Sequence, residues 1–279
     1  MNEIELLQNA IDKVEAITKN KEWLESLEPR KKEEAEFHDF SHDLTTELEN
    51  KKFYKTTEKS NLYLQNWLKE KVKGKIFLDF ACGNGVTSIK AAEYGASFVI
   101  GLDISSASIN NAKKLAEQKG LNDITRFFVG DCENTQLPEN SIDVVLCAGM
   151  LHHLDLNFAF PELKRILKPG GKIIAVEALN YNPFIKAYRF LTPGMRTEWE
   201  KHHILSMKDV RFASKFFKIK SVRFWHITSF FAAFFGSKKW MLSILNGIDS
   251  LLTRILFVRL LSWQFIFELE KEKKHDSNS

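Results

Sequence analysis

Cysteine and long apolar runs are scarce in this 279-residue chain. It has three cysteines, Cys82, Cys132 and Cys147. An odd number without Cys-x-x-Cys spacing suggests neither a disulfide framework nor a zinc site, so we expect no bound metal. The first residues are acidic and lack the basic segment of a secretory signal, so the cytoplasm is the expected location. No internal repeat indicates a solenoid or a propeller.

The length and the charge distribution bound what remains. The chain is long enough for one large α/β domain with additions or for two small domains, and its hydrophobic content of 44% is ordinary for a globular protein. The net charge is +4, but residues 180–279 hold 17 Lys and Arg residues against 8 Asp and Glu residues. This basic, Phe-rich third of the chain favours an anionic surface as a partner.

The most informative segment is residues 78–85, Leu-Asp-Phe-Ala-Cys-Gly-Asn-Gly. It ends an apolar run over 75–80 that predicts a buried strand, and it precedes a segment over 86–94 that predicts a helix. A glycine-rich turn between a strand and a helix lets the backbone approach a ligand and directs the N–H groups of the helix toward it. A dinucleotide site prefers Gly-x-Gly-x-x-Gly, whereas this segment lacks the third glycine and carries Asp79 at the end of the strand.

Further strands follow at regular spacing, and polar residues stand at their ends. Alternation of such strands with helices and short turns predicts a parallel, doubly wound sheet. A carboxylate at the end of the second strand can accept both hydroxyls of a ribose. The strands and the residues after them are 96–103 with Asp103, 124–129 with Asp131 and Cys132, 142–147 with the segment 148–153, and 172–176 with Glu177.

Over about residues 70–180, this ordered set resembles the class I S-adenosylmethionine (SAM) dependent methyltransferases. The resemblance implies a Rossmann-like doubly wound seven-stranded sheet with SAM as the cofactor. It also implies that Asp103 binds the ribose and that Asp131 holds the adenine amino group, although Asp103 is also a candidate helix cap, a role that Ser105 and Ser106 fill equally well. The cofactor-binding residues expected on this basis are Tyr54, Asp79, Ala81, Gly83, Gly85, Asp103, Ile104, Asp131, Cys132 and Cys147.

Residues 1–70 predict an N-terminal helical cap. The apolar residues Ile4, Leu7, Ile11, Val14 and Ile17 recur at helical spacing. Aromatic-rich segments at 36–40 and 52–55 are similar to those that fold over the cofactor in many small-molecule methyltransferases. For Tyr54 and for His38, a candidate substrate-binding residue, packing of the helices on the sheet is an equally good interpretation.

Residues 178–205 follow the fifth strand within a core that we place at 71–227. Pro183, Pro193 and Gly194 argue against a long helix there. Because α/β sheets bind ligands at the carboxyl ends of their strands, this segment is a candidate substrate lid, with Tyr181 and Arg196 as substrate-binding residues. The alternative is a surface loop whose charged residues are solvated.

The C-terminal region predicts a helix over 206–216 and two strands, over 217–227 and 263–270. In the family, the last two strands are usually joined by a short turn. Here an apolar and basic insertion at 228–262, which we expect to be helical, separates them, and its interrupted apolar runs do not favour a membrane span. An interfacial membrane helix, a roof over a substrate tunnel, a homodimer contact and ordinary core helices all fit its composition. Residues 271–279 predict a disordered tail.

The expected function is SAM-dependent methyl transfer to an oxygen, nitrogen or carbon nucleophile of a small hydrophobic or lipid-like molecule. An oxygen nucleophile needs a base, and histidine suits this role at neutral pH. The candidate bases are His152, His153, His202 and His203. The alternatives are a protein or RNA methyltransferase and an inactive SAM-binding scaffold. Nucleic acid is not favoured as a substrate. Asn182-Pro183-Phe184 is similar to the Asn/Asp-Pro-Pro-aromatic motif of base methyltransferases, but that motif follows strand four and this segment does not. No recognisable RNA-binding module is present either.

Overall fold

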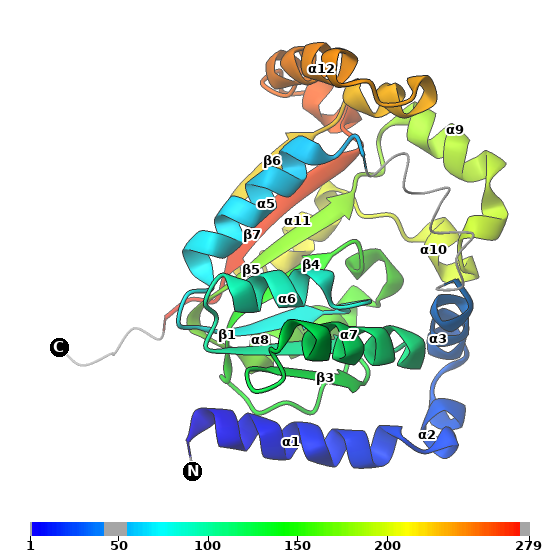
Figure 1. The fold of residues 1–279 in the computed structure, drawn as a ribbon. Coiled ribbons are helices and arrows are strands. Elements are labelled where there is room, and N and C mark those ends of the chain that lie inside the picture. The colour runs from blue at the N-terminus through cyan, green and yellow to red at the C-terminus, as the bar shows by residue number, and fades with distance from the viewer. Residues whose placement is uncertain (1, 42–54, 274–279) are drawn as a thin grey trace.

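The computed structural model describes residues 2–41 and 55–273, in which a seven-stranded sheet carries helices on both faces (Figure 1). Its strand order is β3-β2-β1-β4-β5-β7-β6. Strand β7 runs antiparallel to both of its neighbours and the other pairs are parallel, which confirms the predicted α/β class. The strands are β1 (Ile76–Phe80), β2 (Phe98–Asp103), β3 (Thr125–Val129), β4 (Ile142–Ala148), β5 (Leu167–Ala178), β6 (Lys218–Trp225) and β7 (Gln264–Glu270).

Strand β5 begins earlier than the sequence predicts. We expected a turn before Lys172, but β5 already includes Leu167. The pairing of β5 with β4 changes register here, since Ile142 pairs with Leu167 and Val144 pairs with Lys172. Pro169, Gly170 and Gly171, which lie between these partners, therefore form an irregularity within the strand. Proline and glycine favour such irregularities as well as turns, so the sequence alone did not distinguish the two.

The helices cover the two faces of the sheet because successive strand residues point to opposite sides. Leu78 of β1 packs in a core with α1, α8 and α11, whereas its neighbour Phe77 packs with α5 and α6. All five residues of β1 are buried, as a parallel strand covered on both faces requires. The helices on the faces are α1 (Glu3–Thr18), α5 (Glu58–Lys71), α6 (Val86–Glu93), α7 (Ser106–Lys119), α8 (Leu156–Ile166) and α11 (Met207–Ala213).

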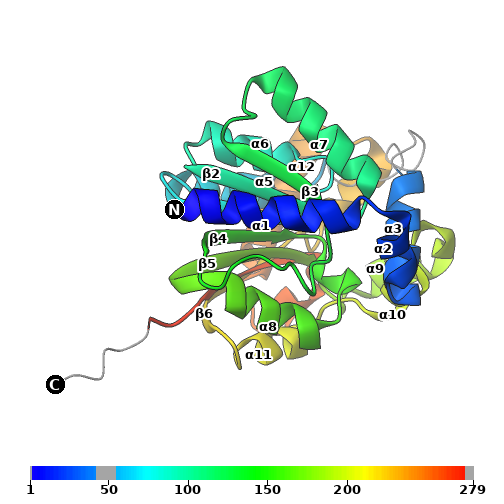
Figure 2. The ribbon, with the colours of Figure 1, turned by 90° about the horizontal axis from the view of Figure 1, so that it is seen from below.

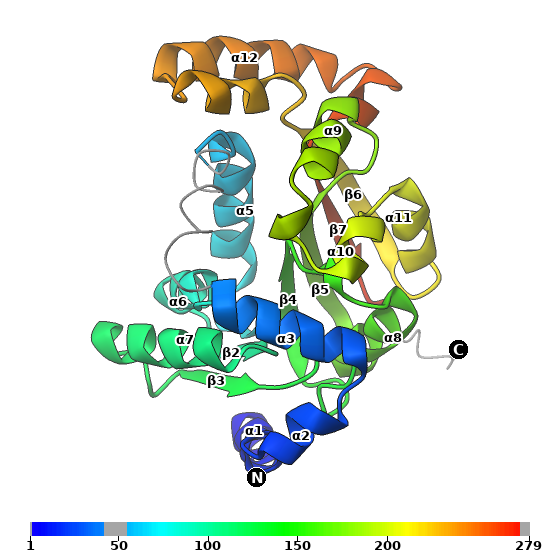
Figure 3. The same cartoon turned by 90° about the vertical axis from the view of Figure 1, so that its right-hand side faces the viewer.

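The described N-terminal residues are helical, as predicted. Helix α1 begins with a capping box between Asn2 and Glu5 and buries Leu7, Ile11 and Val14 against the sheet, while Ile17 in its last turn is exposed. Two further helices follow it, α2 (Lys21–Ser26) and α3 (Pro29–Ser41). Figures 2 and 3 show α1 along the sheet and α3 crossing beside α7. The predicted cofactor residue Tyr54 lies outside the described residues.

The segment after β5 contains only short helices, in agreement with its proline content. They are α9 (Pro183–Leu191), the 3₁₀ turn η2 (Pro193–Met195) and α10 (Glu198–His202). The insertion between β6 and β7 is helical, as predicted, and contains η3 (Ser229–Phe235), α12 (Lys239–Leu252) and η4 (Val258–Leu261). Within residues 2–41 and 55–273, no helix has the length and apolar character needed to cross a membrane.

Candidate active site

Glycine conformations hold the turn after β1. Gly83 and Gly85 have φ values of 50° and 74°, a region that glycine favours. A Cβ atom on Gly85 would lie 2.7 Å from the Cβ of Ala112, so this glycine also lets the turn approach α7. Beneath the turn, the buried Asp79 accepts a hydrogen bond from Ser88 (2.7 Å), and burial raises the pKa of Asp79 to about 7. Asp79 and Gly85 therefore shape the turn from within the protein.

The carboxylate of Asp103 joins this turn to the end of β2. Its Oδ2 atom accepts the N–H of Gly83 (2.8 Å), and its Oδ1 atom accepts the N–H of Ser105 (2.9 Å). The Ser105 hydroxyl accepts the N–H of Ser108 and caps α7. The side chain of Asp103 is therefore not the helix cap, and each of its oxygens keeps a lone pair for a further donor.

A cavity of about 260 Å³ lies at the carboxyl ends of β1, β2, β3 and β4. This is where the strand order reverses between β1 and β4, the place at which open α/β sheets bind ligands. The predicted cofactor residues that line the cavity are Ala81, Gly83, Asp103, Ile104, Asp131 and Cys132. Asp79, Gly85 and Cys147 do not line it, and Cys147 is fully buried in the core.

Helix α3 covers the cavity and is held there by ion pairs that the sequence did not predict. The Nζ atom of Lys31 lies 2.7 Å from Asp131 Oδ2 and 2.9 Å from Glu133 Oε2. Arg30 lies 2.7 Å from Glu133 Oε1. Although burial opposes it, hydrogen bonds to Asp131 and Glu133 raise the pKa of Lys31. Asp131, predicted to bind adenine, is thus already paired with a cation from the cap.

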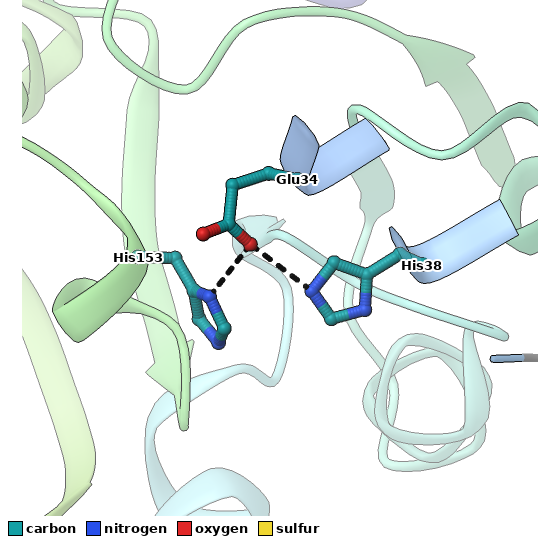
Figure 4. A group of neighbouring side chains, drawn as sticks. All are labelled: Glu34, His38 and His153. Carbon is teal, nitrogen blue, oxygen red and sulfur yellow. Dashed lines mark hydrogen bonds and ion pairs between the residues drawn. The ribbon is translucent and has the colours of Figure 1, made fainter. Parts of the chain in front are cut away.

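Glu34, His38 and His153 form a cluster on the cavity wall (Figure 4). His153 Nδ1 lies 2.9 Å from Glu34 Oε2, and His38 Nε2 lies 3.6 Å from the same oxygen. The other oxygen of Glu34 accepts a hydrogen bond from Thr197 of the lid segment (2.5 Å). Glu34 therefore connects the cap, the turn after β4 and the segment that follows β5.

The pKa shifts in this cluster favour a neutral His153 beside a charged Glu34. Burial alone would raise the pKa of Glu34, but hydrogen bonds from His153 and His38 hold it well below its usual value. Burial and the neighbouring His152 lower the pKa of His153. A neutral His153 donates Nδ1–H to the Glu34 carboxylate, so its Nε2 is the acceptor. For His38, the hydrogen bond to Glu34 outweighs burial and raises the pKa.

His152 has a different environment from His153. Its Nδ1 atom lies 2.7 Å from Glu177 Oε2, and its Nε2 atom lies 3.8 Å from Glu200 Oε1. The other oxygen of Glu177 accepts the N–H groups of Met150 and Leu151. The Glu177 carboxylate overcomes the effect of burial and raises the pKa of His152. His152 does not line the cavity, so its contacts are those of a residue that fixes the turn after β4.

The candidate residues of the lid segment do not line the cavity either. His202 and His203 are exposed, and the His203 ring stacks on Trp199 at 3.5 Å. Arg196 donates to the carbonyl oxygen of Thr192 (2.7 Å). Tyr181 accepts the N–H of Met207 through its hydroxyl (3.3 Å). The sequence placed these four residues at the substrate, whereas the structure gives them partners within the protein or solvent.

The Glu34, His38 and His153 cluster also has the composition of a metal site. Each residue offers one ligand atom, and the three atoms lie within 4.8 Å of one another. A second set of His152, His153 and Glu200 overlaps it. Two imidazoles with a carboxylate suit divalent transition metals, a donor set that cysteine spacing alone could not reveal.

The comparisons with known proteins agree with this geometry. Residues 78–175 match a family model described as a methyltransferase domain. The chain is 35% identical over 132 residues to a ubiquinone biosynthesis O-methyltransferase of Pseudomonas fluorescens, a match that covers 46% of this chain and 55% of the relative. It is 30% identical over 132 residues to a ribosomal protein L11 methyltransferase of Photobacterium profundum, covering 45% and 43%. The chain thus spans about half the length of these curated relatives.

A solved structure of geranyl diphosphate methyltransferase in complex with SAM has the same fold. Its TM-score is 0.57 at 17% sequence identity, and the match covers 75% of this chain and 84% of that chain. The sheet around residues 78–175 thus has the fold of that structure, and the family match and the curated relatives identify residues 78–175 themselves as a methyltransferase domain of the class I SAM-dependent kind.

Proposed function

We propose that this protein transfers the methyl group of SAM to a small hydrophobic molecule. The observation that carries this proposal is the cavity itself. It brings the glycine turn and Asp103 together with His153, a histidine whose partner is a carboxylate. A methyl transferase needs a cofactor site and an acceptor site side by side, and positioning and exclusion of water then supply most of the catalysis.

The residues present fit SAM. Asp103 retains lone pairs for ribose hydroxyls, and Gly83 presents an uncrowded backbone, since no atom lies within 4 Å of a Cβ built on it. Asp131 and Cys132 line the same cavity at the end of β3, where the adenine is expected. When bound, SAM supplies an electrophilic methyl group. The chain's own contribution is to orient the cofactor and the acceptor.

We assign His153 as the base for an oxygen acceptor. Glu34 accepts its Nδ1–H, which fixes the tautomer and leaves Nε2 to take the acceptor's proton. Glu34 then stabilises the imidazolium that forms. His38, 33% exposed on the same wall, is the candidate substrate-positioning residue. A nitrogen or carbon acceptor would need this base less.

A small acceptor is favoured over a protein or an RNA by the cap. Arg30 and Lys31 of α3 form ion pairs at 2.7 Å with Glu133 and Asp131, which hold the helix across the cavity. The Glu133 side chain is almost fully buried. An acceptor must therefore fit beneath the helix. The relatives include both a ubiquinone and a ribosomal protein methyltransferase, so their names alone do not separate these classes.

The test uses SAM with a radioactive methyl group and measures which class of molecule receives the label. The protein is incubated with fractions of a cell extract that hold lipids and other small molecules, proteins or RNA. Label in the small-molecule fraction that is lost with the Asp103→Ala variant supports the proposal. Label in the protein or RNA fraction would replace it with one of those two acceptor classes. SAM binding without transfer to any fraction would favour the scaffold.

A further inference from the structure

Helix α12 presents its apolar face to solvent. Trp240, Ile244, Ile248 and Leu251 recur every three or four residues and so lie on one face of the helix. Their exposed fractions lie between 41% and 64%. A surface helix of a globular protein usually has the opposite arrangement, with its apolar stripe toward the core.

Two polar residues of α12, Asn246 and Asp249, point inward, and their contacts fix the orientation of the helix. Asn246 and Asp249 are buried. The Asp249 carboxylate accepts the N–H and the hydroxyl of Thr228, both at 2.7 Å, and the N–H of Ser229 at 3.1 Å. Lys59 of α5 donates to the carbonyl oxygen of Asn246 (2.9 Å). Rotating the helix to hide its apolar stripe would break these bonds and leave buried polar groups unpaired.

Neighbouring elements extend the apolar surface. Phe257 follows α12 and is 78% exposed, and Phe190 at the end of α9 is 84% exposed. Helix α9 is joined to the insertion by Phe184, whose ring lies 5.2 Å from that of Phe231, and by Asn182, which donates to the carbonyl oxygen of Leu261 (2.6 Å). Figures 1 and 3 show α9 and α12 at the same end of the molecule. Exposed apolar residues gathered at one end of a molecule mark a contact with a partner or a membrane.

The charges on this surface are of one sign. Lys186, Lys238, Lys239 and Arg254 are exposed, and none of them forms an ion pair with a residue in the described ranges 2–41 and 55–273. The only acidic residue in 183–191 and 229–261 is the buried Asp249. The surface therefore offers apolar side chains with cations beside them and no exposed carboxylate.

We propose that α9, η3, α12 and η4 form a surface that binds the face of a lipid bilayer with anionic headgroups. A helix of 14 residues is about 21 Å long, too short to span a bilayer, but it can lie in the interface with its apolar side chains below the headgroups and its cations among them. A second copy of this chain fits less well, because a symmetric contact would bring the same cations face to face.

The test is co-sedimentation of the full chain with vesicles of phosphatidylcholine alone or with 30% phosphatidylserine, at low and high salt. We expect binding to the anionic vesicles that weakens as salt rises. Neither SAM nor an acceptor is present, so the result is independent of the proposed methyl transfer. Equal, negligible sedimentation with both kinds of vesicle would overturn the proposal.

Two variants test the contribution of the apolar side chains to membrane binding. Each changes an exposed residue, so the protein should still fold. Phe257→Glu and Trp240→Glu should each lower vesicle binding by roughly tenfold, because each removes one large apolar side chain from the buried face. Phe158→Glu is the matched control, since Phe158 is 57% exposed on α8, a helix far from α12 (Figure 3), and this variant should bind as the wild type does. Equal effects of all three substitutions would contradict the assignment.

The charged part is tested by the double variant Lys238→Ala, Lys239→Ala. At about 1 kcal/mol for each basic residue near an anionic surface, it should bind roughly 30-fold more weakly. The control is Lys73→Ala, Lys75→Ala, which removes two exposed lysines before β1. A dimer in light scattering that Phe257→Glu dissociates would overturn the proposal in favour of a second copy.

Discussion

The substitution Glu34→Gln isolates the proposed role of Glu34 in proton transfer. It keeps the size of the side chain and removes the charge that faces His153 Nδ1 at 2.9 Å. A hydrogen bond to a charged group contributes about 1.5–3 kcal/mol, so losing it should lower kcat by roughly 10- to 150-fold. SAM affinity should change little, because Asp103 and Gly83 hold the cofactor in the proposed site.

The pH profile separates this role from a merely structural one. A base acts in its neutral form, so activity rises as pH increases through the pKa of His153, which burial and His152 place below its ordinary value. The Glu34 carboxylate acts in the opposite direction and raises that pKa. Removing the carboxylate should therefore move the acidic limb of the kcat profile to lower pH while its plateau falls.

The assay is radioactive methyl transfer across the pH range, with SAM binding measured by calorimetry. Glu33→Gln is the matched control, since Glu33 is on the same helix and accepts the N–H of Glu198 at the surface. Glu34→Asp should recover part of the activity. An unchanged kcat in a folded Glu34→Gln variant, or an acidic limb that moves to higher pH, would refute the assignment of His153 as the base.

Two further predictions concern stability. Gly85→Ala should lower stability by about 1–3 kcal/mol, because φ is positive there and the new Cβ would lie 2.7 Å from Ala112; Gly194→Ala, with open space around it, should not, and equal melting temperatures would contradict this. His226 is buried between Ser60 and Ser229, and burial lowers its pKa from 6.5 to about 4. The folded state therefore binds fewer protons than the unfolded state below pH 6.5. The resulting contribution to the free energy of unfolding, about 3 kcal/mol, is complete above pH 6.5 and is lost as pH falls toward 4. Urea unfolding at pH 7 and pH 5 should show a smaller loss for His226→Asn than for the wild type or for the exposed control His202→Asn; parallel losses would refute it.

The strands and the glycine turn could be predicted because their signals are local. Apolar runs mark β1 and β2, and Gly83 and Asp103 stand at the strand ends where the sheet places them together. The covering role of α3 could not be predicted in this way. The helix carries mostly charged residues and no apolar stripe, and its partners lie far away in the sequence, as Lys31 and Asp131 do.

The roles of the two adjacent histidines and the direction of α12 depend on tertiary contacts that the sequence does not reveal. His152 and His153 are adjacent in sequence, yet only the fold gives one of them Glu177 and the other Glu34 and the cavity. For α12, the sequence indicates an amphipathic helix but not the direction of its apolar face. That direction depends on Asp249, whose buried partners come from the residues before η3 and at its start.

The central claim is that SAM binds at Asp103 and the glycine turn, and calorimetric titration tests it most directly. Wild-type protein should bind SAM, and Asp103→Ala should weaken binding by about 1–3 kcal/mol, the scale of hydrogen bonds lost in a buried polar site. The melting temperature of the variant without SAM establishes that it is folded. A folded Asp103→Ala variant that binds SAM with unchanged affinity would contradict the account.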